Sequence, residues 1–303
     1  MAQFFLFPTR QVRIRSSAAI AMLGLIVASS AGATPFLSAD VGHGGVGSNE
    51  LLPCSPPGGV FTSTGAPVSS HAVCGPTGFG EGSGSATASI GNLGAEARGR
   101  HFGNGSSIGM SGTALYSDFV VFSGPGSDPV PGRMNLQFGG SLNSDIGGAA
   151  SVTFRAIVNG TFVGADTVRV ESGVPSCPDN FPHVHFSGLG PCVLTYNVTL
   201  QSSLISVPQD TPISFQLDLE ADGGGGGPGG SGTSLFSDTF GFIVGGPVFD
   251  LPAGFTADSP TSFIAGNLFL PPGALPAVPE PSSMLLLTGG LGLLTMLRRR
   301  RAA

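Results

Sequence analysis

Apolar residues in the central part of this chain recur at every second position, which is the spacing of a strand with one buried face. The clearest run covers residues 213–221. Its odd-numbered positions are all apolar, whereas Gln216, Asp218 and Glu220 form a polar face. The body shows no sustained run of apolar residues at the 3.6-residue interval of a helix. The pattern therefore predicts antiparallel strands with one side in a core and the other in water.

Turn signals separate these runs. The dipeptide Asn159-Gly160 stands between residues 151–158 and 161–168, and it favours a two-residue hairpin turn. Residues 193–207 indicate one long strand or two short ones. Together these features predict an all-β fold, namely an antiparallel, jelly-roll-like β-sandwich over residues 86–274. The 22 Phe residues agree with it, because two facing sheets need bulky side chains between them.

Residues 34–85 are rich in Gly, Pro and Ser and show little alternation. We expect an irregular segment there, with room for one strand. The chain holds 50 Gly in all, and glycine is common in the tight turns that join short strands. Residues 112–118 (GTALYSD) and 232–238 (GTSLFSD) are nearly alike. We interpret them as strands at matching places in the sandwich, possible neighbours, although chance similarity is the alternative in so biased a composition.

The charge of the chain is distributed unevenly. Lys is absent, and seven of the twelve Arg lie near the two ends. Residues 34–279 keep five Arg against seventeen acids, a formal charge of −12 (5 − 17). Because such a surface repels phosphate backbones, we expect no nucleic-acid partner.

Residues 1–33 have the three parts of a secretory signal peptide. Arg10, Arg13 and Arg15 form a positive region, and residues 18–28 form an apolar region. Ala31 and Ala33 provide the small side chains that signal peptidase requires, so cleavage is predicted before Thr34. The alternative is an uncleaved anchor helix.

The C-terminus, residues 275–303, has its own ordered signal. Val278, Pro279, Glu280 and Pro281 form an extended strip, because each proline disfavours helical geometry in the residue before it. The next residues, 282–297, are uncharged and would form a helix roughly 24 Å long, marginal for crossing a membrane. Arg298, Arg299, Arg300 and Arg301 then stop translocation and hold this end in the cytoplasm. An ordinary C-terminal anchor is the alternative interpretation.

This order of Pro-Glu-Pro strip, short apolar helix and terminal Arg cluster resembles the PEP-CTERM sorting signal of exosortase substrates. The resemblance implies a Gram-negative bacterium that makes exopolysaccharide. It also implies two processing partners, signal peptidase and a membrane-embedded exosortase that cuts near the Pro-Glu-Pro strip. The inner membrane would anchor the precursor transiently with its body in the periplasm, and the mature form would be at the cell surface or extracellular.

Four cysteines in an exported chain suggest two disulfides. Three pairings are possible, and proximity in sequence favours Cys54 with Cys74 and Cys177 with Cys192. A zinc site is less favoured, because the chain has no Cys-x-x-Cys spacing.

The sequence shows no convincing catalytic or metal-binding set, so we expect neither an enzyme nor a cofactor. Asp218, Glu220 and Asp222 resemble the start of a calcium loop, but a glycine stands where the bidentate Glu should be. We interpret these residues as acids on the solvent-facing side of a strand. A weak calcium site at the surface is the alternative.

These features favour a structural or adhesive protein associated with exopolysaccharide. A secreted carbohydrate-binding module is the first alternative, weakened by the lack of Trp and by only two Tyr. A secreted hydrolase is the second. Carboxylates facing each other in a cleft would favour the hydrolase, and an exposed aromatic strip would favour the binding module.

Overall fold

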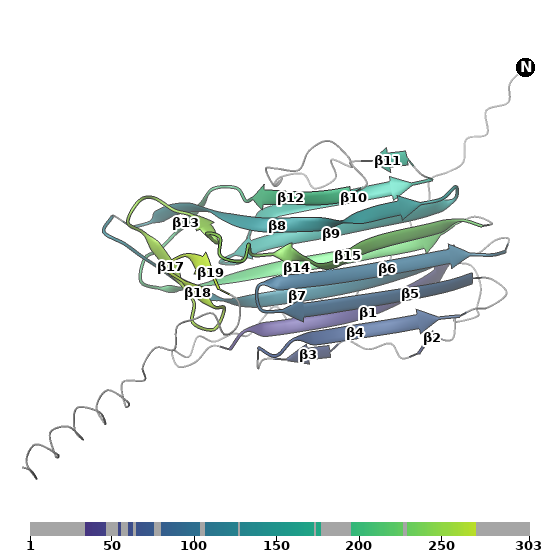
Figure 1. Ribbon diagram of the computed structural model, residues 1–303, viewed down its shortest axis with the longest axis horizontal. Coiled ribbons are helices and arrows are strands. Elements are labelled where there is room, and N and C mark those ends of the chain that lie inside the picture. The colour runs from purple at the N-terminus through teal and green to yellow at the C-terminus, as the bar shows by residue number, and fades with distance from the viewer. Residues whose placement is uncertain are drawn as a thin grey trace, which may run out of the picture.

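The computed structural model describes residues 34–46, 54–55, 60–62, 65–75, 80–103, 107–126, 128–172, 174–176, 195–226 and 229–270. This part of the chain is all-β, and every pair of strands in it is antiparallel. Most strands run along the long axis of the molecule, and the short strands near the end of the described chain lie together at one end (Figure 1). The predicted fold class, an all-β antiparallel protein, is confirmed.

Two sheets contain nearly all of the strands. Sheet 1 has the order β11 (Val174–Ser176), β10 (Thr161–Glu171), β9 (Gly148–Val158), β14 (Pro212–Gly225), β7 (Ser107–Ser123), β1 (Phe36–Val46) and β3 (Val60–Thr62), and β17 (Thr256–Asp258) also pairs with β7. Sheet 2 has the order β12 (Thr195–Gln201), β8 (Val130–Ser144), β15 (Ser231–Gly241), β6 (Asn92–His101), β5 (Gly80–Ser89), β4 (Val68–Cys74) and β2 (Cys54–Ser55). Two short strands, β13 (Ile205–Val207) and β16 (Phe249–Asp250), pair with β8, and β18 (Ile264–Ala265) pairs with β19 (Leu268–Phe269).

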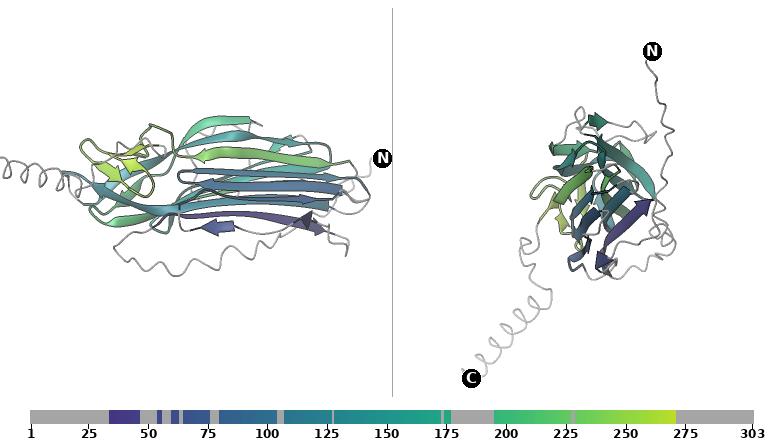
Figure 2. Two further views of the ribbon diagram at one scale, coloured as in Figure 1. Left: turned by 60° about the horizontal axis from the view of Figure 1, so that its bottom comes forward. Right: turned by 90° about the vertical axis from the view of Figure 1, so that its right-hand side faces the viewer.

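The core lies between the two sheets, which Figure 2 shows from the side and from one end. Strand β7 alternates between buried and partly exposed positions along all 17 of its residues. One half of the core is aromatic: the ring of Phe138 on β8 lies 4.2 Å from that of Phe154 on β9, centroid to centroid, and 5.1 Å from that of Phe236. Burial of these rings supplies much of the hydrophobic stabilisation.

Glycine and alanine fill the other half of the core, where the sheets approach through their backbones. A Cβ added at Gly112 on β7 would lie 2.3 Å from the carbonyl oxygen of Ser85 on β5. A Cβ added at Gly223 on β14 would lie 2.5 Å from the carbonyl oxygen of Ala97 on β6. Real Cβ atoms essentially never come so close. These glycines therefore lie inside strands and set the spacing of the sheets, rather than forming turns as we expected.

The hairpin predicted at Asn159-Gly160 is confirmed. Strands β9 and β10 pair on either side of it, and both turn residues have positive φ, 50° at Asn159 and 74° at Gly160. Positive φ at both central residues is the geometry of a type I′ turn, whose twist matches that of the flanking strands. Of residues 193–207, the described part, 195–207, contains two short strands, β12 and β13, which is one of the two predicted outcomes.

The expected boundary at residue 86 is wrong. Strand β5 crosses it, and β1 and β4 also come from the segment that we expected to be irregular. Glycines and serines concealed the alternation, because a glycine on the inward face of a strand does not look apolar. The two similar heptapeptides lie on β7 and β15, each an interior strand that is third from one edge of its own sheet. They are thus in matching places but are not neighbours, contrary to one option above.

Candidate functional site

The residues that carry the predicted sorting signals lie outside the described residues. This applies to Ala31 and Ala33 at the N-terminus, and to Val278, Pro279, Glu280, Pro281, Arg298, Arg299, Arg300 and Arg301 at the C-terminus. Within the described ranges, no helix is long and apolar enough to cross a membrane. Strand β1 begins at Phe36 and β19 ends at Phe269. Cleavage at both predicted sites would therefore leave all the described strands in the mature protein.

The cysteines are described only in part. Strands β2 and β4 pair with Cys54 directly opposite Cys74, so the backbone register agrees with the preferred pairing. The Cys74 side chain is buried, and its Sγ lies 3.5 Å from the Sδ of Met110. Cys177 and Cys192 lie outside the described residues. Both disulfides stay predictions.

The acidic row predicted on one strand face lies on the outer surface of sheet 1. Arg155 on β9 donates to Asp218 at 2.8 Å and to Glu220 at 3.5 Å, and Ser151 donates to Asp222 at 3.2 Å. Burial raises the pKa of Asp222 to about 7, and the charge of Glu220 adds to the rise, whereas Ser151, Arg169 and Arg155 oppose it. The three carboxyls are half-buried, so this face is less hydrated than the alternation alone indicated.

These carboxyls are engaged by neighbouring side chains rather than grouped around a common point. Arg155 already compensates two of them. Among the described residues, no group of three or more His, Cys, Asp or Glu side chains is arranged to hold a metal ion. The calcium alternative at Asp218, Glu220 and Asp222 thus gains no support from this geometry.

A further carboxyl, that of Asp118 on β7, points into the core. It accepts hydrogen bonds from the Ser262 hydroxyl and from the backbone N–H of Phe119. Burial raises the pKa of Asp118, and the hydrogen bonds from Ser262, Thr261 and Phe119 counteract part of the rise. Since Ser262 precedes β18, this contact ties the last described segment to sheet 1. Sequence reasoning missed it, because Asp118 reads as one more polar residue near the end of a strand.

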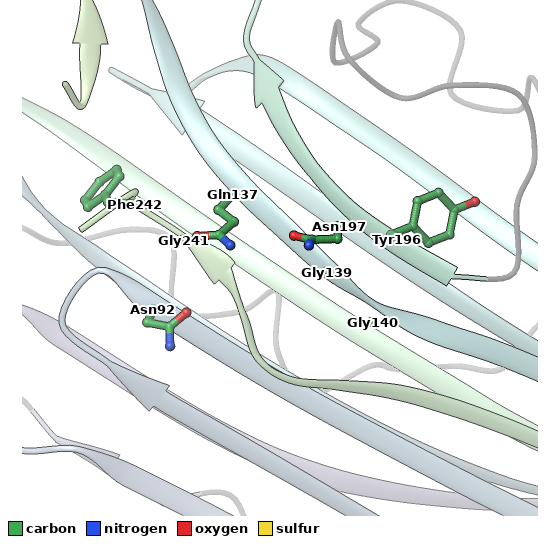
Figure 3. Close-up of a pocket in the computed structure, with 8 residues that line it drawn as sticks. All are labelled: Asn92, Gln137, Gly139, Gly140, Tyr196, Asn197, Gly241 and Phe242. Atoms are coloured by element: carbon green, nitrogen blue, oxygen red, sulfur yellow. The ribbon is translucent and has the colours of Figure 1, made fainter. Parts of the chain in front are cut away.

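The outer face of sheet 2 contains a hollow of about 330 Å³, lined by three amide side chains and a glycine floor (Figure 3). Its lining residues are Asn92, Gln137, Gly139, Gly140, Tyr196, Asn197, Gly241 and Phe242. The amides come from β6, β8 and β12, and the strand register brings them together: Gln137 and Asn92 both pair with Gly241, and Asn197 pairs with Gly139. Figure 3 shows Gln137 and Asn197 side by side.

A bulge in β15 shapes this hollow. Leu235 of β15 pairs with Ser141 of β8, and Phe240 of β15 pairs with Phe138 of β8. The four residues of β15 between these pairs therefore lie opposite only two residues of β8, Gly139 and Gly140. Gly140 has φ of 144°, a conformation that side chains rarely adopt, and a Cβ there would lie 2.5 Å from the carbonyl oxygen of Leu235. The glycine pair therefore permits the bulge, and bulges of this kind often occur beside functional sites.

A second hollow of about 430 Å³ adjoins the first, because Asn92 lines both. It is bounded by residues of β4 and β5 together with the segment before β4: Pro67, Val68, Ser69, Thr87, Ala88 and Ser89. Every described lining residue of the two hollows is uncharged. Such hydroxyl and amide groups donate and accept hydrogen bonds but do not exchange protons near neutral pH. The arrangement suits binding of a neutral polar ligand rather than acid–base chemistry.

Sequence reasoning did not find these hollows. Asn92, Gln137 and Asn197 are far apart in the chain, and no motif links them. The doubled glycine at Gly139-Gly140 is a signal only in retrospect, since isolated or paired glycines within a strand pattern indicate a bulge.

The comparisons with known proteins concern the C-terminus. Residues 277–301 match the family model of the PEP-CTERM protein-sorting motif. A search of curated proteins and a search of solved structures each gave no match. The predicted resemblance of the tail is therefore confirmed, and the motif supports an exported protein that an exosortase recognises.

Proposed function

We propose that this chain, which carries a PEP-CTERM protein-sorting motif at residues 277–301, is a structural or adhesive component of an extracellular exopolysaccharide layer. The observation that carries the proposal is the motif itself, because it directs a protein to an exosortase. An N-terminal signal peptide would bring the chain to the membrane, and the tail would hold it there until cleavage near Pro279. The body would then act outside the cytoplasm.

The limits of the described strands support this route. All of them lie between Phe36 and Phe269, inside the two predicted cleavage points. Removal of both ends would cost the body none of the strand pairings and none of the core side chains found among the described residues. A signal that is to be discarded has to be separable from the fold in this way.

The surface of the body favours a non-enzymatic role. None of the described residues that line the two hollows carries a carboxylate, so the facing acids of a glycoside hydrolase are not found there. The Phe rings serve mainly as core: those of Phe122, Phe138, Phe154, Phe215, Phe236, Phe240 and Phe249 are fully buried. Both outer faces present mostly hydroxyl, amide and charged groups, as expected of a protein in a hydrated matrix.

The carbohydrate-binding alternative has one observation against it and one in its favour. The exposed aromatic side chains of the described part are Phe102, which follows β6 of sheet 2, and Phe162, on β10 of sheet 1, and they form no stacking strip. However, the amide-lined hollows offer hydrogen bonds to sugar hydroxyls without aromatic stacking. This possibility refines the matrix role rather than replacing it.

Mass spectrometry of the protein isolated from its native envelope tests the sorting route. We expect a mature N-terminus at Thr34 and a C-terminus that lacks Arg298 to Arg301. A mature pool that still contains Arg301 would contradict processing of the tail.

A pair of variants makes the test specific. Replacing Pro279, Glu280 and Pro281 by Ala should leave the full tail in place and the protein in the membrane fraction. Replacing Pro271 and Pro272 by Ala provides the matched control, because it changes prolines of the same region outside the motif. The control should be processed as the wild type is.

Association with the matrix is tested separately by fractionation. The processed protein should sediment with the exopolysaccharide and leave it after enzymatic digestion of the polymer. Recovery of the processed protein entirely in the free, soluble fraction would count against the structural role while leaving the sorting route intact.

A further inference from the structure

We propose that the outer face of sheet 2 binds a neutral polysaccharide chain, which lies across the strands along the two hollows that share Asn92. The inference rests on the proposed function, because it assumes that the protein works among extracellular polysaccharide. It goes further by identifying the surface, the direction of the ligand and its charge class.

The strand register aligns the polar groups in one transverse band. Asn197 on β12 pairs with Gly139 on β8, and across the bulge of β15, Thr87 on β5 pairs with Ser69 on β4. The side chains of Asn197, Thr87 and Ser69 come from three strands of one sheet, with Gly139 between them on β8. Gln137 and Asn92 lie in the adjoining row. The band spans five strand spacings from β12 to β4, roughly 24 Å. That length accommodates several sugar units of an extended chain.

The chemistry of the band matches sugar hydroxyls. An amide group presents a carbonyl oxygen as acceptor and an NH₂ group as donor, so it can bind a hydroxyl in either role. Gln137 and Asn197 are exposed, and they lie side by side at the mouth of the first hollow (Figure 3). Ser and Thr on β4 and β5 add hydroxyls at the second hollow. The pattern is that of a site for a polyhydroxylated ligand.

The bulge is the feature that turns a flat sheet into a hollow. Four residues of β15 face two of β8, which locally disrupts the ladder between them. The backbone of Gly140 could not follow this path with a side chain, since a Cβ would collide with Leu235 and Phe236. A floor without side chains lets a ligand approach the backbone closely. Such an irregularity weakens the strand pairing at the centre of a sheet, and a binding role would explain it.

The charge distribution selects a neutral chain over an acidic one. The described lining residues carry no charge, and the segment 34–279 has a formal charge of −12. A uronate or sulfate chain would meet this negative field without any Arg along the band to compensate it. The opposite outer face, on sheet 1, holds the acidic row of Asp218, Glu220 and Asp222 and would repel such a chain still more.

Affinity electrophoresis of the processed protein tests the inference, with the protein produced in a host that has an exosortase and purified from its envelope or medium. Native gels would contain dextran, a soluble β-glucan or galactomannan as neutral probes, and polygalacturonate as the acidic probe. We expect at least one neutral polymer to retard the wild type, and polygalacturonate not to do so. Retardation by the acidic polymer alone, or by none of the four, would overturn the inference.

Variants locate the site. The double variant Asn197→Ala/Gln137→Ala should raise the dissociation constant about tenfold, because two hydrogen bonds are lost. Asn143→Ala is the matched control, since Asn143 is an exposed amide on the same face, farther along β8. It should bind as the wild type does. Far-UV circular dichroism checks that all variants are folded, and equal retardation of the double variant and the wild type would refute the site.

The two proposals fail in different ways. If the protein is processed and sediments with polysaccharide but the double variant does so equally well, the matrix role stands and this surface is not its basis. If neither the wild type nor any variant associates with polysaccharide in the native envelope, the proposed function itself fails.

Discussion

The pKa of the half-buried Asp222 depends on its burial and on neighbours from three strands. Asp222 lies on β14 beside Ser151 on β9, and burial raises its pKa to about 7. The negative Glu220 two positions away adds to the rise, and the hydrogen bond from Ser151 opposes it. An unfolded Asp has a pKa of about 3.9. The folded protein therefore binds more protons than the unfolded chain between these values, and its free energy of unfolding falls as pH rises from about 4 to 7.

The variant Asp222→Asn should reduce this pH dependence. After allowance for solvent screening, we expect the difference in unfolding free energy between pH 4 and pH 7.5 to shrink by about 2 kcal/mol. Urea unfolding at several pH values measures it. Asp40→Asn, at an exposed acid of the same outer face on β1, should leave the slope unchanged. A steeper slope in the Asp222 variant would contradict the assignment.

At the scale of elements, the glycines between the sheets determine how closely strands from opposite sheets can approach. Gly112 on β7 lies against the backbone of β5, whereas the Cβ of an alanine at position 226, just after β14, would make an ordinary contact of 3.5 Å with Gly147. Both positions hold glycine, but only position 226 has room for a methyl group, because only Gly112 lies between the sheets.

Substitution at these two glycines distinguishes the effect of packing between the sheets from the effect on the entropy of the unfolded chain. Gly112→Ala should lower the free energy of unfolding by about 3 kcal/mol, since the sheets must move apart to admit a methyl group. Gly226→Ala should be neutral or stabilise by about 0.5 kcal/mol, because alanine restricts the unfolded chain more than glycine does. Urea unfolding at one pH compares them, and equal effects would show that the close approach of the sheets is not rigid.

The β2–β4 pair carries the predicted disulfide. A bond between Cys54 and Cys74 would close a loop of some 20 residues and contribute about 3 kcal/mol. Mass spectrometry of a non-reduced digest should find these two cysteines in one linked peptide. The variant Cys54→Ser/Cys74→Ser should unfold at correspondingly lower urea concentration. A peptide that links Cys54 to Cys177 or Cys192 would show a different connectivity.

The whole molecule is closed at one end by its last described segment. Strand β17 pairs with β7, Ser262 binds the buried Asp118, and the Phe269 ring packs 5.5 Å from that of Phe242. The body therefore includes these residues, while the sorting motif begins after them at residue 277. This division predicts how shortened chains behave.

A chain ending at residue 276 should unfold within about 1 °C of the longer chain ending at residue 303, since no described core contact is lost. A chain ending at residue 255 should lose at least about 3 kcal/mol, because Phe269 and Ile264 leave the core and Asp118 loses its Ser262 partner. Calorimetry of the three chains measures both effects. A large loss on removing residues 277–303 alone would mean that the tail belongs to the fold.

The sequence by itself determined the features that depend on near neighbours in the chain. Alternation placed the inward face of β14, the Asn159-Gly160 pair placed the turn between β9 and β10, and the ordered tail identified the sorting motif. Each is a local signal, because strand period, turn geometry and a linear recognition motif are all set within a few residues.

Only the tertiary structure decided what lies opposite each strand. It placed the glycines at the start of β5, in an apparently irregular segment, on the inner face of their sheet. It also buried Asp118 against Ser262 and assembled Asn92, Gln137 and Asn197 into one hollow. The physical reason is that the spacing of two sheets, and the side chains that meet across strands, depend on residues far apart in the chain. No local pattern contains that information.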